Sequence, residues 1–410
     1  MIIADLQIHS RFSRATSKDI TFQNLEKYAR IKGLNLLGTG DFQHPLQFKA
    51  INNELEEDEN GILWSKTKFP FLLQTEISLI YTQNGKGQRT HHLIFSPSKD
   101  VAKQIIDALS RKGRLDYDGR PIFGFNSIEL VDMMRSISDE IEIIPAHIWT
   151  THFSLMGEYN QLSRVEDCFR DNTRYIHALE TGMSSDPAMN WRISSLDKFQ
   201  LVSFSDAHSA FPWRIGREAT IFDFKDLSYK NFLKAIRTGE GLESTIETYT
   251  RYGKYHFTGH RDCGVSFSPE ESKKLNYLCP KCKHKLTVGV ADRVEHLADR
   301  PVGYIRDKSR PFVSLVPLHE LIAVAYGIKQ LYSKKVWGVY NSLVSKFGNE
   351  FNLLLKAEEK DLKDVINNKL IDLIIKNRED KLKIKAGYDG LYGEITLEDN
   401  GAEQKTLSRF

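Results

Sequence analysis

The sequence lacks any run of about 18 uninterrupted apolar residues, so we expect no membrane-spanning helix and no membrane partner. Four cysteines among 410 residues are too few for a disulfide framework, which favours a reducing compartment. No basic and apolar leader precedes the first apolar segment, and we therefore expect no secretion signal. Internal repeats and low-complexity linkers are also absent. Together these absences predict a folded protein of the cytoplasm.

Charge is unevenly divided along the chain. Residues 251–410 contain 28 lysines and arginines against 21 acidic residues, a net charge of +7, whereas residues 1–250 contain 29 against 33, a net charge of −4. A basic C-terminal part suits a polyanion such as a nucleic acid. Ordinary surface charge accounts for the same numbers, so charge alone leaves both interpretations open.

Residues 1–250 alternate apolar segments with amphipathic ones, which is the pattern of repeated βα units. The expected strands, read as buried and parallel, are Ile2–His9, Leu36–Asp41, Phe71–Glu76, Ile141–His147 and Leu201–Asp206. The expected helices are Thr21–Lys32, Val101–Lys112 and Ser127–Ser138. A turn at residues 84–87 predicts a hairpin between Ile77–Thr82 and Arg89–Phe95.

Two smaller units are expected after this α/β domain. Residues 251–300 hold pairs of cysteine and histidine but too little apolar material for a core of their own. Residues 301–410 are expected to form a helical C-terminal domain that binds DNA. Its predicted elements are helices at Leu318–Tyr332, Lys335–Lys346 and Asp361–Lys376, followed by a hairpin of Lys383–Ala386 with Gly393–Leu397.

Side chains of the metal-ligand type recur through the first 210 residues, nearly every one at the end of an apolar segment. They are His9, Asp41, His44, Glu76, His91 or His92, His147, Glu180, Asp206 and His208. Each alone is more often an ordinary hydrogen-bonding residue, but several unrelated strands would not all end this way by chance. Because the active sites of α/β barrels gather at the carboxyl ends of the strands, we expect one pocket. Imidazoles and carboxylates there, without thiolates, suit zinc, manganese or iron better than calcium or magnesium alone. We expect a hydrolase with two or three divalent metals, zinc, manganese or magnesium.

A second metal pattern lies in residues 251–300. His260-x-x-Cys263 and Cys279-x-x-Cys282 are two chelating pairs with a 15-residue spacer, as in a zinc ribbon or knuckle. A redox-active CxxC pair is the alternative, but no thioredoxin-like βαβ pattern surrounds it. His256 and His284 compete for the position of the fourth ligand. We expect one structural zinc ion, because the segment has too little core to fold without metal.

The motifs of the first domain resemble those of the polymerase-and-histidinol-phosphatase (PHP) family of phosphoesterases, in the same order. The segments that carry the resemblance are Asp5–Ser10, Gly38–Phe42, Glu76, His91–Leu93, Pro145–His147 and Ser205–His208. The resemblance implies a distorted seven-stranded α/β barrel, similar to a TIM barrel, with up to three metals. The implied ligands are His9, Glu76 and Asp206 for one metal, Glu76, His92 and His147 for a second, and His208 with the Asp41/His44 region for a third.

Two positions depart from the PHP pattern. Gln7 stands where the family has a histidine, and an amide oxygen is a weaker neutral ligand than imidazole. Either one metal binds less tightly there, or the change inactivates the site. Phe42 replaces a histidine of the second motif, and His44 is the expected substitute two residues on.

A narrower resemblance, to the endonuclease Q family, covers nearly the whole chain. It rests on residues 146–150, 179–187, 189–192, 253–256, 261–265 and 387–393. It implies a DNA repair endonuclease that nicks double-stranded DNA on the 5′ side of uracil, hypoxanthine, xanthine and abasic sites, leaving a 3′-hydroxyl and a 5′-phosphate. The catalytic groups would be Asp206, Glu76 and His208, and association with the nucleoid would follow.

Reading one altered base in a duplex requires that base to be flipped into a pocket. The candidates for the pocket and for phosphate contacts are Trp149, His152, Phe153, Ser184, Trp191, Arg192, Trp213 and Arg214. Packing in the barrel is the alternative for each aromatic residue. Gln404–Phe410 suggests a peptide that binds a sliding clamp, a second candidate partner. The alternatives to the repair enzyme are a PHP phosphatase of a small phosphate ester and a DNA-damage binder whose catalytic site is weakened.

Overall fold

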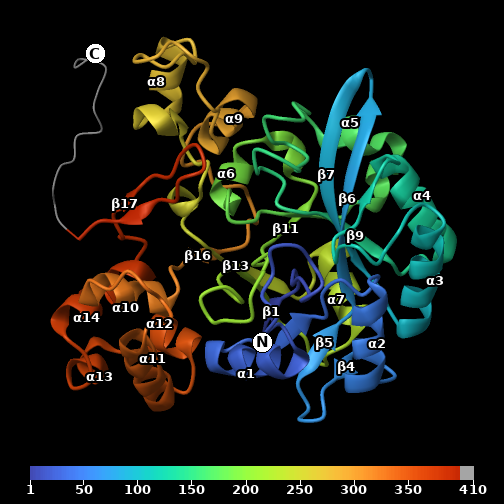
Figure 1. Cartoon of the computed structure of the whole chain (residues 1–410), viewed down its shortest axis with the longest axis horizontal. Coiled ribbons are helices and arrows are strands. Elements are labelled where there is room, and N and C mark those ends of the chain that lie inside the picture. The colour runs from blue at the N-terminus through green and yellow to red at the C-terminus, as the bar shows by residue number, and fades with distance from the viewer. Residues whose placement is uncertain (398–410) are drawn as a thin grey trace.

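The structure is a computed structural model that describes residues 1–397. Figure 1 shows a large α/β body, a small lobe around α8 (Pro269–Lys274) and α9 (Val290–Leu297), and a group of helices from α10 to α14. No helix in the described range has the length and hydropathy that crossing a bilayer requires. The clamp-like segment Gln404–Phe410 lies outside the described residues.

The α/β body is a closed ring of seven strand segments. They are β1 (Ile2–Asp5), β2 (Leu36–Gly38), β5 (Pro70–Leu72) continuing as β6 (Gln74–Gln83), β7 (Lys86–Phe95), β9 (Glu142–Pro145), β10 (Ala178–Glu180) and β11 (Gln200–Val202). Strand pairs or contacts join each segment to the next, and a bridge between Ile8 and Ala207 closes the ring. The distorted seven-stranded barrel is therefore confirmed. It is not wholly parallel, because β7 runs antiparallel to β6 and β9.

Further strands widen the sheet on both sides of the ring. They are β12 (Ala219–Phe222), β13 (Leu242–Glu247) and β16 (Phe312–Ser314) beside β1, then β3 (Glu56–Glu57) and β4 (Leu63–Trp64) beside β5, and β8 (Ile122–Phe123) beside β6. Because β16 pairs with β13, residues expected in the C-terminal unit complete the sheet of the first one.

The barrel interior is apolar at one end. Every ring segment contributes to one buried cluster that contains Leu6, Leu36, Leu72, Leu93, Ile144, Ala178 and Val202. Helix α7 (Tyr229–Thr238) adds Phe232 and Ile236 to the same cluster and so closes this end. Polar side chains are left to the opposite end, where the parallel strands reach their carboxyl termini.

The expected helices of the barrel are present. They are α1 (Phe22–Lys32), α3 (Lys99–Ser110) and α4 (Ser127–Ile137). The barrel also has three helices that were not predicted, α2 (Pro45–Glu54), α5 (Val165–Phe169) and α6 (Pro187–Trp191). Helix α1 begins after Thr21, whose side chain accepts the N–H of Asn24, and ends at Gly33 with φ of 100°. Helix α3 lies two residues earlier than predicted, because Ser98 caps it.

The small lobe is built around four potential metal ligands. Strands β14 (Thr258–His260) and β15 (Val265–Phe267) form its hairpin. The buried cluster around its hairpin contains Val265, Phe267, Cys279 and Leu286, whereas Val290 and Val294 of α9 pack into the main core. A core of this size cannot support a fold by itself, which agrees with the need for a metal.

The C-terminal part is helical, as predicted, but its boundaries differ. The helices are α10 (Leu318–Tyr326), α11 (Lys334–Phe347), α12 (Glu350–Lys356), α13 (Glu359–Lys363) and α14 (Asn368–Arg378), and the final hairpin is β17 (Ile384–Lys385) with β18 (Glu394–Ile395). Helix α10 ends at Gly327 rather than at Tyr332, since Gly327 takes the left-handed conformation. The helix predicted at Asp361–Lys376 is two helices, because Asn367 starts a new one by capping it.

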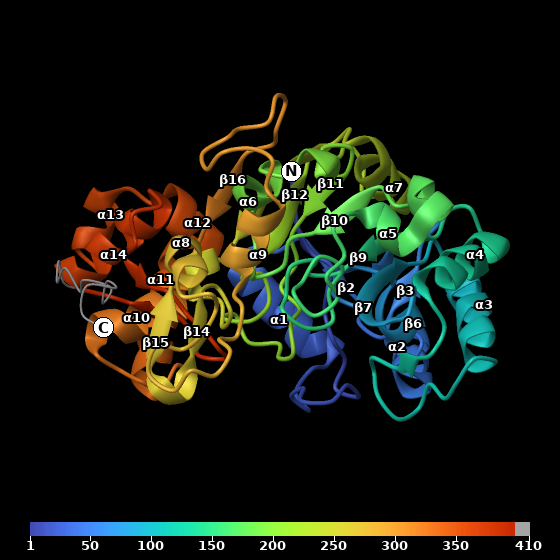
Figure 2. The ribbon, with the colours of Figure 1, turned by 90° about the horizontal axis from the view of Figure 1, so that it is seen from above.

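A buried ion pair joins the helical part to the barrel, where α12 meets α1 (Figure 2). The Nζ of Lys32 lies 2.7 Å from Oε1 of Glu350, and neither side chain is more than 1% exposed. Tyr340 donates its hydroxyl to Oε2 of Glu350, and Lys32 also donates to the carbonyl of Pro212. Every charge in this contact therefore has partners, as a buried pair requires.

Candidate metal centre

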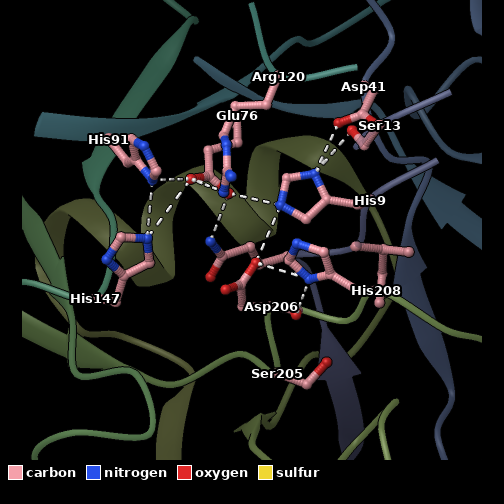
Figure 3. Close-up of polar contacts among 12 residues, drawn as sticks. His9, Ser13, Asp41, Glu76, His91, Arg120, His147, Ser205, Asp206 and His208 are labelled. Carbon is pink, nitrogen blue, oxygen red and sulfur yellow. Dashed lines mark hydrogen bonds and ion pairs between the residues drawn. The ribbon is translucent and has the colours of Figure 1, made fainter. Parts of the chain in front are cut away.

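Acidic and imidazole side chains converge at the carboxyl end of the barrel, opposite α7. Figure 3 shows them pointing towards one another from several strands. They form two groups whose ligand atoms lie within 4.8 Å of one another, His9 with Asp206 and His208, and Glu76 with His91 and His147. The convergence of strand ends expected from the sequence is therefore present.

The first group surrounds the ring of His9. Its Nε2 lies 3.0 Å from Oδ1 of Asp206 and 3.0 Å from Oε2 of Glu76. His208 stands next to it, with Nδ1 3.7 Å from Oδ1 of Asp206. These atoms offer two carboxylates and two imidazoles to one cation.

The second group shares Glu76 with the first. Oε1 of Glu76 lies 2.6 Å from Nδ1 of His91 and 3.5 Å from Nε2 of His147. The two imidazole nitrogens are 3.2 Å apart. Glu76 therefore faces one group with each of its oxygens, which is the arrangement of a bridging carboxylate.

The protonation states suit divalent cations. Burial works to raise the pKa of Glu76, but Arg120 and His91 hold it well below its usual range. Burial also opposes ionisation of Asp206, yet His208 and His9 keep its pKa low. Burial lowers the pKa of His91 to about 4, so this ring is neutral near pH 7. Burial lowers the pKa of His9 too, but Asp41, Asp206 and Glu76 raise it well above its usual range, so a cation bound there would have to replace its proton. A neutral imidazole beside an anionic carboxylate, as at His91 and Glu76, is the donor set that zinc and manganese take.

Backbone strain marks the same residues. Asp41, His147 and Asp206 have φ angles of 41°, 31° and 49°, in a region that residues with a side chain rarely adopt. Such strain costs on the order of 1–3 kcal/mol per residue and persists where the surroundings impose it, often at functional sites. All three stand just after strands that point into the pocket.

Asp41, predicted to lie in the region of a third metal, lies outside both groups. Its Oδ1 lies 3.2 Å from Nδ1 of His9, on the side of the ring away from Asp206 and Glu76. Its Oδ2 accepts the N–H of Ser10 and the hydroxyl of Ser13. Asp41 thus holds the ring of His9 from behind, which is the usual place of an outer-shell carboxylate in metal sites.

Two further predicted ligands, His92 and His44, lie outside the two groups. His92 turns to the other face of β7, and its Nε2 lies 2.9 Å from the hydroxyl of Ser127. His91, its neighbour, is the one that meets Glu76. The Nδ1 of His44 accepts the N–H of Leu46 at the start of α2, and the ring stacks on Phe12 at 4.8 Å.

Gln7 lies at the centre of the site. Its Nε2 donates to Oε2 of Glu76 at 2.8 Å, while its Oε1 is buried without a hydrogen-bond partner. Oε1 of Glu180 is buried in the same way, although its other oxygen accepts the N–H of His147. Buried acceptors without donors are costly unless a cation or water satisfies them, so both atoms fit a metal site.

Arg120 was missed by the sequence analysis. Its Nη1 lies 3.4 Å from Oε1 of Glu76, and its side chain is 29% exposed at the mouth of the site. It belongs to the excursion between α3 and α4, where no periodic pattern distinguishes one arginine from another.

The residues expected to read the base divide into two sets. Trp149, Trp191 and Trp213 are at most 8% exposed, and Trp149 donates to Asn190, so they pack in the core. Arg192 is held by Glu295 at 2.6 Å. Ser184 and Arg214 are half-buried.

Only the loop after His147 brings predicted residues to the site. Phe153 lies 4.9 Å from the ring of His91, and His152 is exposed beside Tyr159 at 6.2 Å. Arg89 lies over Tyr159, with its guanidinium 4.2 Å from the centre of the ring.

The small lobe places its four predicted ligands together. The ligand atoms of His260, Cys263, Cys279 and Cys282 lie within 4.8 Å of one another. The Nδ1 of His260 is 3.3 Å from Sγ of Cys282. Burial opposes ionisation of Cys279, but hydrogen bonds from Cys282, His260 and Lys281 lower its pKa to about 6, which favours the thiolate that zinc binds. The competing His256 and His284 stand outside this group.

Comparisons with known proteins match the whole chain. A protein-family model, the MJ0043 C-terminal domain, matches residues 317–381. "Uncharacterized protein YqxK" of Bacillus subtilis is 31% identical over 96% of this chain and 99% of its own. "Uncharacterized protein MJ0043" of Methanocaldococcus jannaschii is 30% identical over 77% of this chain, which spans 40% of that longer protein.

Two solved structures resemble the chain throughout. One is the lesion-specific endonuclease PfuEndoQ from Pyrococcus furiosus, with 30% identity, a TM-score of 0.86 and coverage of 100% of this chain and 99% of the other. The second is Endonuclease Q in complex with a 27-mer duplex substrate that has an abasic lesion at the active site, also with 30% identity, a TM-score of 0.86 and 99% coverage of both chains. Identity of this degree over essentially the full length shows that the chain belongs to the endonuclease Q family.

Proposed function

We propose that this protein is a metal-dependent DNA repair endonuclease. It hydrolyses the phosphodiester on the 5′ side of uracil, hypoxanthine, xanthine and abasic sites, and it leaves a 3′-hydroxyl and a 5′-phosphate. The observation that carries the proposal is Glu76, a fully buried carboxylate at the open end of the barrel, whose two oxygens face His91 of one group of metal-type ligands and His9 of the other. The full-length likeness to a lesion-specific endonuclease supports the substrate class.

The metal site of the proposal uses the residues of both groups. His9, Asp206 and His208 would hold one ion, His91 and His147 a second, with Glu76 shared. Divalent cations bound there supply Lewis-acid activation of water and relief of charge on the phosphate. The protein itself orients the metal-type ligands, because Asp41 holds the ring of His9 and Gln7 holds one oxygen of Glu76.

An aromatic surface beside the second group suits the recognition of an unpaired base. Phe153 adjoins His91, and Tyr159 is 43% exposed under the guanidinium of Arg89. An extruded base stacks on such rings, while an arginine can meet the neighbouring phosphate. We therefore assign the reading of the base to Phe153, His152 and their neighbours rather than to the buried tryptophans.

The small lobe is proposed to hold one structural zinc through His260, Cys263, Cys279 and Cys282. Four converging ligands, three of them sulfur, form a closed site with no position left for substrate. The role of this lobe and of the basic C-terminal part is to bind duplex DNA. If so, affinity for DNA falls steeply as salt rises, by counterion release. A flat salt dependence contradicts this role.

The deciding experiment uses end-labelled duplexes that differ in one base. A duplex with deoxyuridine or deoxyinosine is compared with its normal counterpart in Mg²⁺ and in Mn²⁺. A single nick 5′ of the altered base, with ends that ligase and phosphatase assays identify as 3′-hydroxyl and 5′-phosphate, supports the proposal. Intact altered duplexes in both metals reject it.

A matched pair of variants separates cleavage from binding. Asp206→Asn removes a metal-type carboxylate, and we expect cleavage to fall by more than about a hundredfold, since even outer-shell changes cost 10–100-fold. Affinity for the altered duplex should stay within a factor of about two, because the carboxylate of Asp206 contacts His9 and would not itself contact a DNA phosphate. Asp226→Asn, at an exposed aspartate, is the control and should cleave normally.

The second candidate is a weakened DNA-damage binder, and it rests on Gln7. A neutral amide oxygen in this position is a weaker ligand for a cation than an imidazole nitrogen is. Gln7→His distinguishes the two, because a large gain in turnover marks a weakened site, whereas an unchanged rate shows that Gln7 is not limiting. If the protein were instead a phosphatase of a small ester, it would hydrolyse a phosphate monoester rapidly and show no preference among the duplexes.

A further inference from the structure

Strands β6 and β7 form a long two-stranded ribbon, and one face of β6 leads from the barrel interior to the protein surface (Figure 1). Alternate residues of a strand share a face, so Ser78 and Ile80 follow Glu76 on the same side. Four residues of extended chain span roughly 13 Å, which sets the separation of Ile80 from Glu76 along the strand. Glu76 is fully buried, whereas Ile80 is 39% exposed.

Two further apolar side chains are exposed beside Ile80. Strand β8 pairs with β6 so that Ile122 lies next to Ser78, and Ile122 is 45% exposed. Tyr117 is 37% exposed, and its hydroxyl accepts the N–H of Ile122 at 2.6 Å and donates to the carbonyl of the same residue at 3.4 Å. Both contacts hold the tyrosine against β8. We call Ile80, Tyr117 and Ile122 the apolar edge.

The apolar edge stands beside the open end of the barrel, because the segment that joins Tyr117 to Ile122 enters the site. Arg120 lies in this segment, and its Nη1 is 3.4 Å from Oε1 of Glu76 (Figure 3). Gly119 donates its N–H to a carbonyl of the loop after β1. The edge and the metal-type ligands therefore hold fixed positions relative to each other.

The surroundings of the apolar edge are basic. Residues 111–122 contain four arginines and lysines against two aspartates. Arg11 and Arg14 of the loop after β1 are exposed, and the N–H of Arg14 ties this loop to Asp118 at 3.2 Å. An apolar patch with cations around it matches a nucleic acid, which has base faces inside and phosphates outside.

The aromatic surface proposed to read the base lies across the ribbon from the apolar edge. In the pairing of β6 with β7, Ile80 stands opposite Arg89, whose guanidinium is 4.2 Å from the ring centre of Tyr159. Neighbouring strands lie about 4.8 Å apart. A base extruded onto Phe153 and Tyr159 therefore leaves its vacated place in the duplex near Ile80.

We propose that the apolar edge is a wedge that occupies the gap left in the base stack when the damaged nucleotide is extruded. The proposal rests on the proposed function, because it needs a lesion in a duplex. Extrusion breaks stacking and pairing, and proteins that unstack DNA insert apolar side chains between base steps. The edge offers apolar surface and no free hydrogen-bonding group to the bases, so it acts on the opening of the duplex and not on the choice of lesion.

The first test compares a fully paired duplex with one in which deoxyuridine lies in a short bubble of mismatched pairs. The Ile80→Thr, Ile122→Thr double variant keeps β-branched side chains on the strands but makes the edge polar. We expect cleavage of the paired duplex to fall on the order of tenfold, the cost of losing a stacking contact. Cleavage in the bubble should be unchanged, because no stacked bases have to be held apart there.

Leu46→Ser, at a residue of α2 that is 55% exposed, is the control for this test and should cleave both duplexes normally. Deoxyinosine should lose as much as deoxyuridine in the double variant, because the edge does not contact the extruded base. An equal loss on the paired and the bubble duplex overturns the wedge, and so does an unchanged rate on the paired duplex.

The second test measures binding and needs no cleavage. In an Asp206→Asn background, fluorescence anisotropy compares the affinity for a duplex with a synthetic abasic site with that for an intact duplex. Tyr117→Ala should reduce the preference for the abasic duplex on the order of tenfold and leave the affinity for the intact one unchanged. Tyr117→Phe keeps the ring and should retain most of the preference.

Three results of the binding test overturn the wedge. They are an unchanged preference in Tyr117→Ala, an equal loss of affinity for both duplexes, and a starting protein that does not prefer the abasic duplex. Because only binding is measured, the test stands even if no duplex is cleaved, and the wedge can fail separately from the proposed function.

Discussion

Asp41 lies behind His9, with Oδ1 3.2 Å from Nδ1, while Nε2 of the same ring is 3.0 Å from Asp206. The carboxylate therefore fixes which nitrogen faces the site and in which direction it points. This relationship separates the residues that would bind metal from those that hold the ligands in place.

Replacing Asp41 tests that division. Asp41→Asn keeps the shape but removes the charge, and we expect the affinity for one barrel metal to fall by about 10–100-fold. Competition with a chelating dye measures this directly, without any substrate. Asp116→Asn, at an exposed aspartate of a nearby loop, is the control. Equal affinities in the two variants would show that Asp41 does not support His9.

His91 and His92 form a matched pair one residue apart, because they point to opposite faces of β7. His91→Gln should abolish one metal site, whereas His92→Gln should keep the full metal content. The second change disturbs the contact between His92 and Ser127, so it should cost about 1–3 kcal/mol of unfolding free energy. Elemental analysis and denaturant titration of both variants separate these effects. Loss of metal in His92→Gln with retention in His91→Gln would reverse the assignment.

The small lobe should depend on its metal. Cys279→Ser removes a buried ligand, and we expect the chain to lose one zinc ion and residues 251–300 to become sensitive to protease. The barrel ions should remain. Cys168→Ser, at a buried cysteine next to Tyr81 and far from the lobe in sequence, should keep all the zinc. A Cys279→Ser protein with full zinc and normal resistance would contradict the structural site.

His319 should make the protein sensitive to acid. Burial lowers its pKa to about 3, well below the 6.5 of the unfolded chain, so the unfolded state binds more protons between these values. The neutral ring stabilises the fold fully above pH 6.5, and this contribution is lost as pH falls towards 3. Between pH 6.5 and 4 the loss is on the order of 3 kcal/mol.

The variant His319→Phe isolates this residue. The ring of His319 packs against Trp213, Trp337 and Tyr340, and both of its nitrogens are buried without hydrogen-bond partners. Phenylalanine fits between the same aromatic side chains and has no titratable group. Denaturant midpoints measured from pH 7 to pH 4 should therefore fall less steeply in the variant. A slope equal to that of the unchanged protein would contradict the prediction.

The sequence predicted the barrel because apolar strand segments ending in polar ligands are a strong local signal. His9, Glu76, His147 and Asp206 each follow or lie in such a segment, and the structure brings them together. A strand pattern alone could not choose between His91 and His92, since both neighbours alternate equally well and only the sheet's packing decides. Arg120 carries no periodic signal, because it lies in the loop that follows α3.

The C-terminal boundaries were harder for a related reason. The helical spacing of Asp361–Lys376 continues across the break between α13 and α14, which depends on the cap at Asn367. Helix α12 was missed, although Asn349 caps it, because its seven residues give too short a pattern. Local chemistry, rather than hydrophobic periodicity, sets both boundaries.

The buried contact between Lys32 and Glu350 limits how this protein can be cut into pieces. Lys32 also holds the carbonyl of Pro212, four residues after His208, so the ligand-bearing loop and the C-terminal helices share one point of attachment. A fragment that ends near residue 250 would lose both the carboxylate partner of Lys32 and the side chains of α12 that bury it, such as Phe351, so this part of the barrel surface would be exposed to water. The barrel is continuous in sequence and in topology, but the loop after His208 is held in place partly by the C-terminal helices.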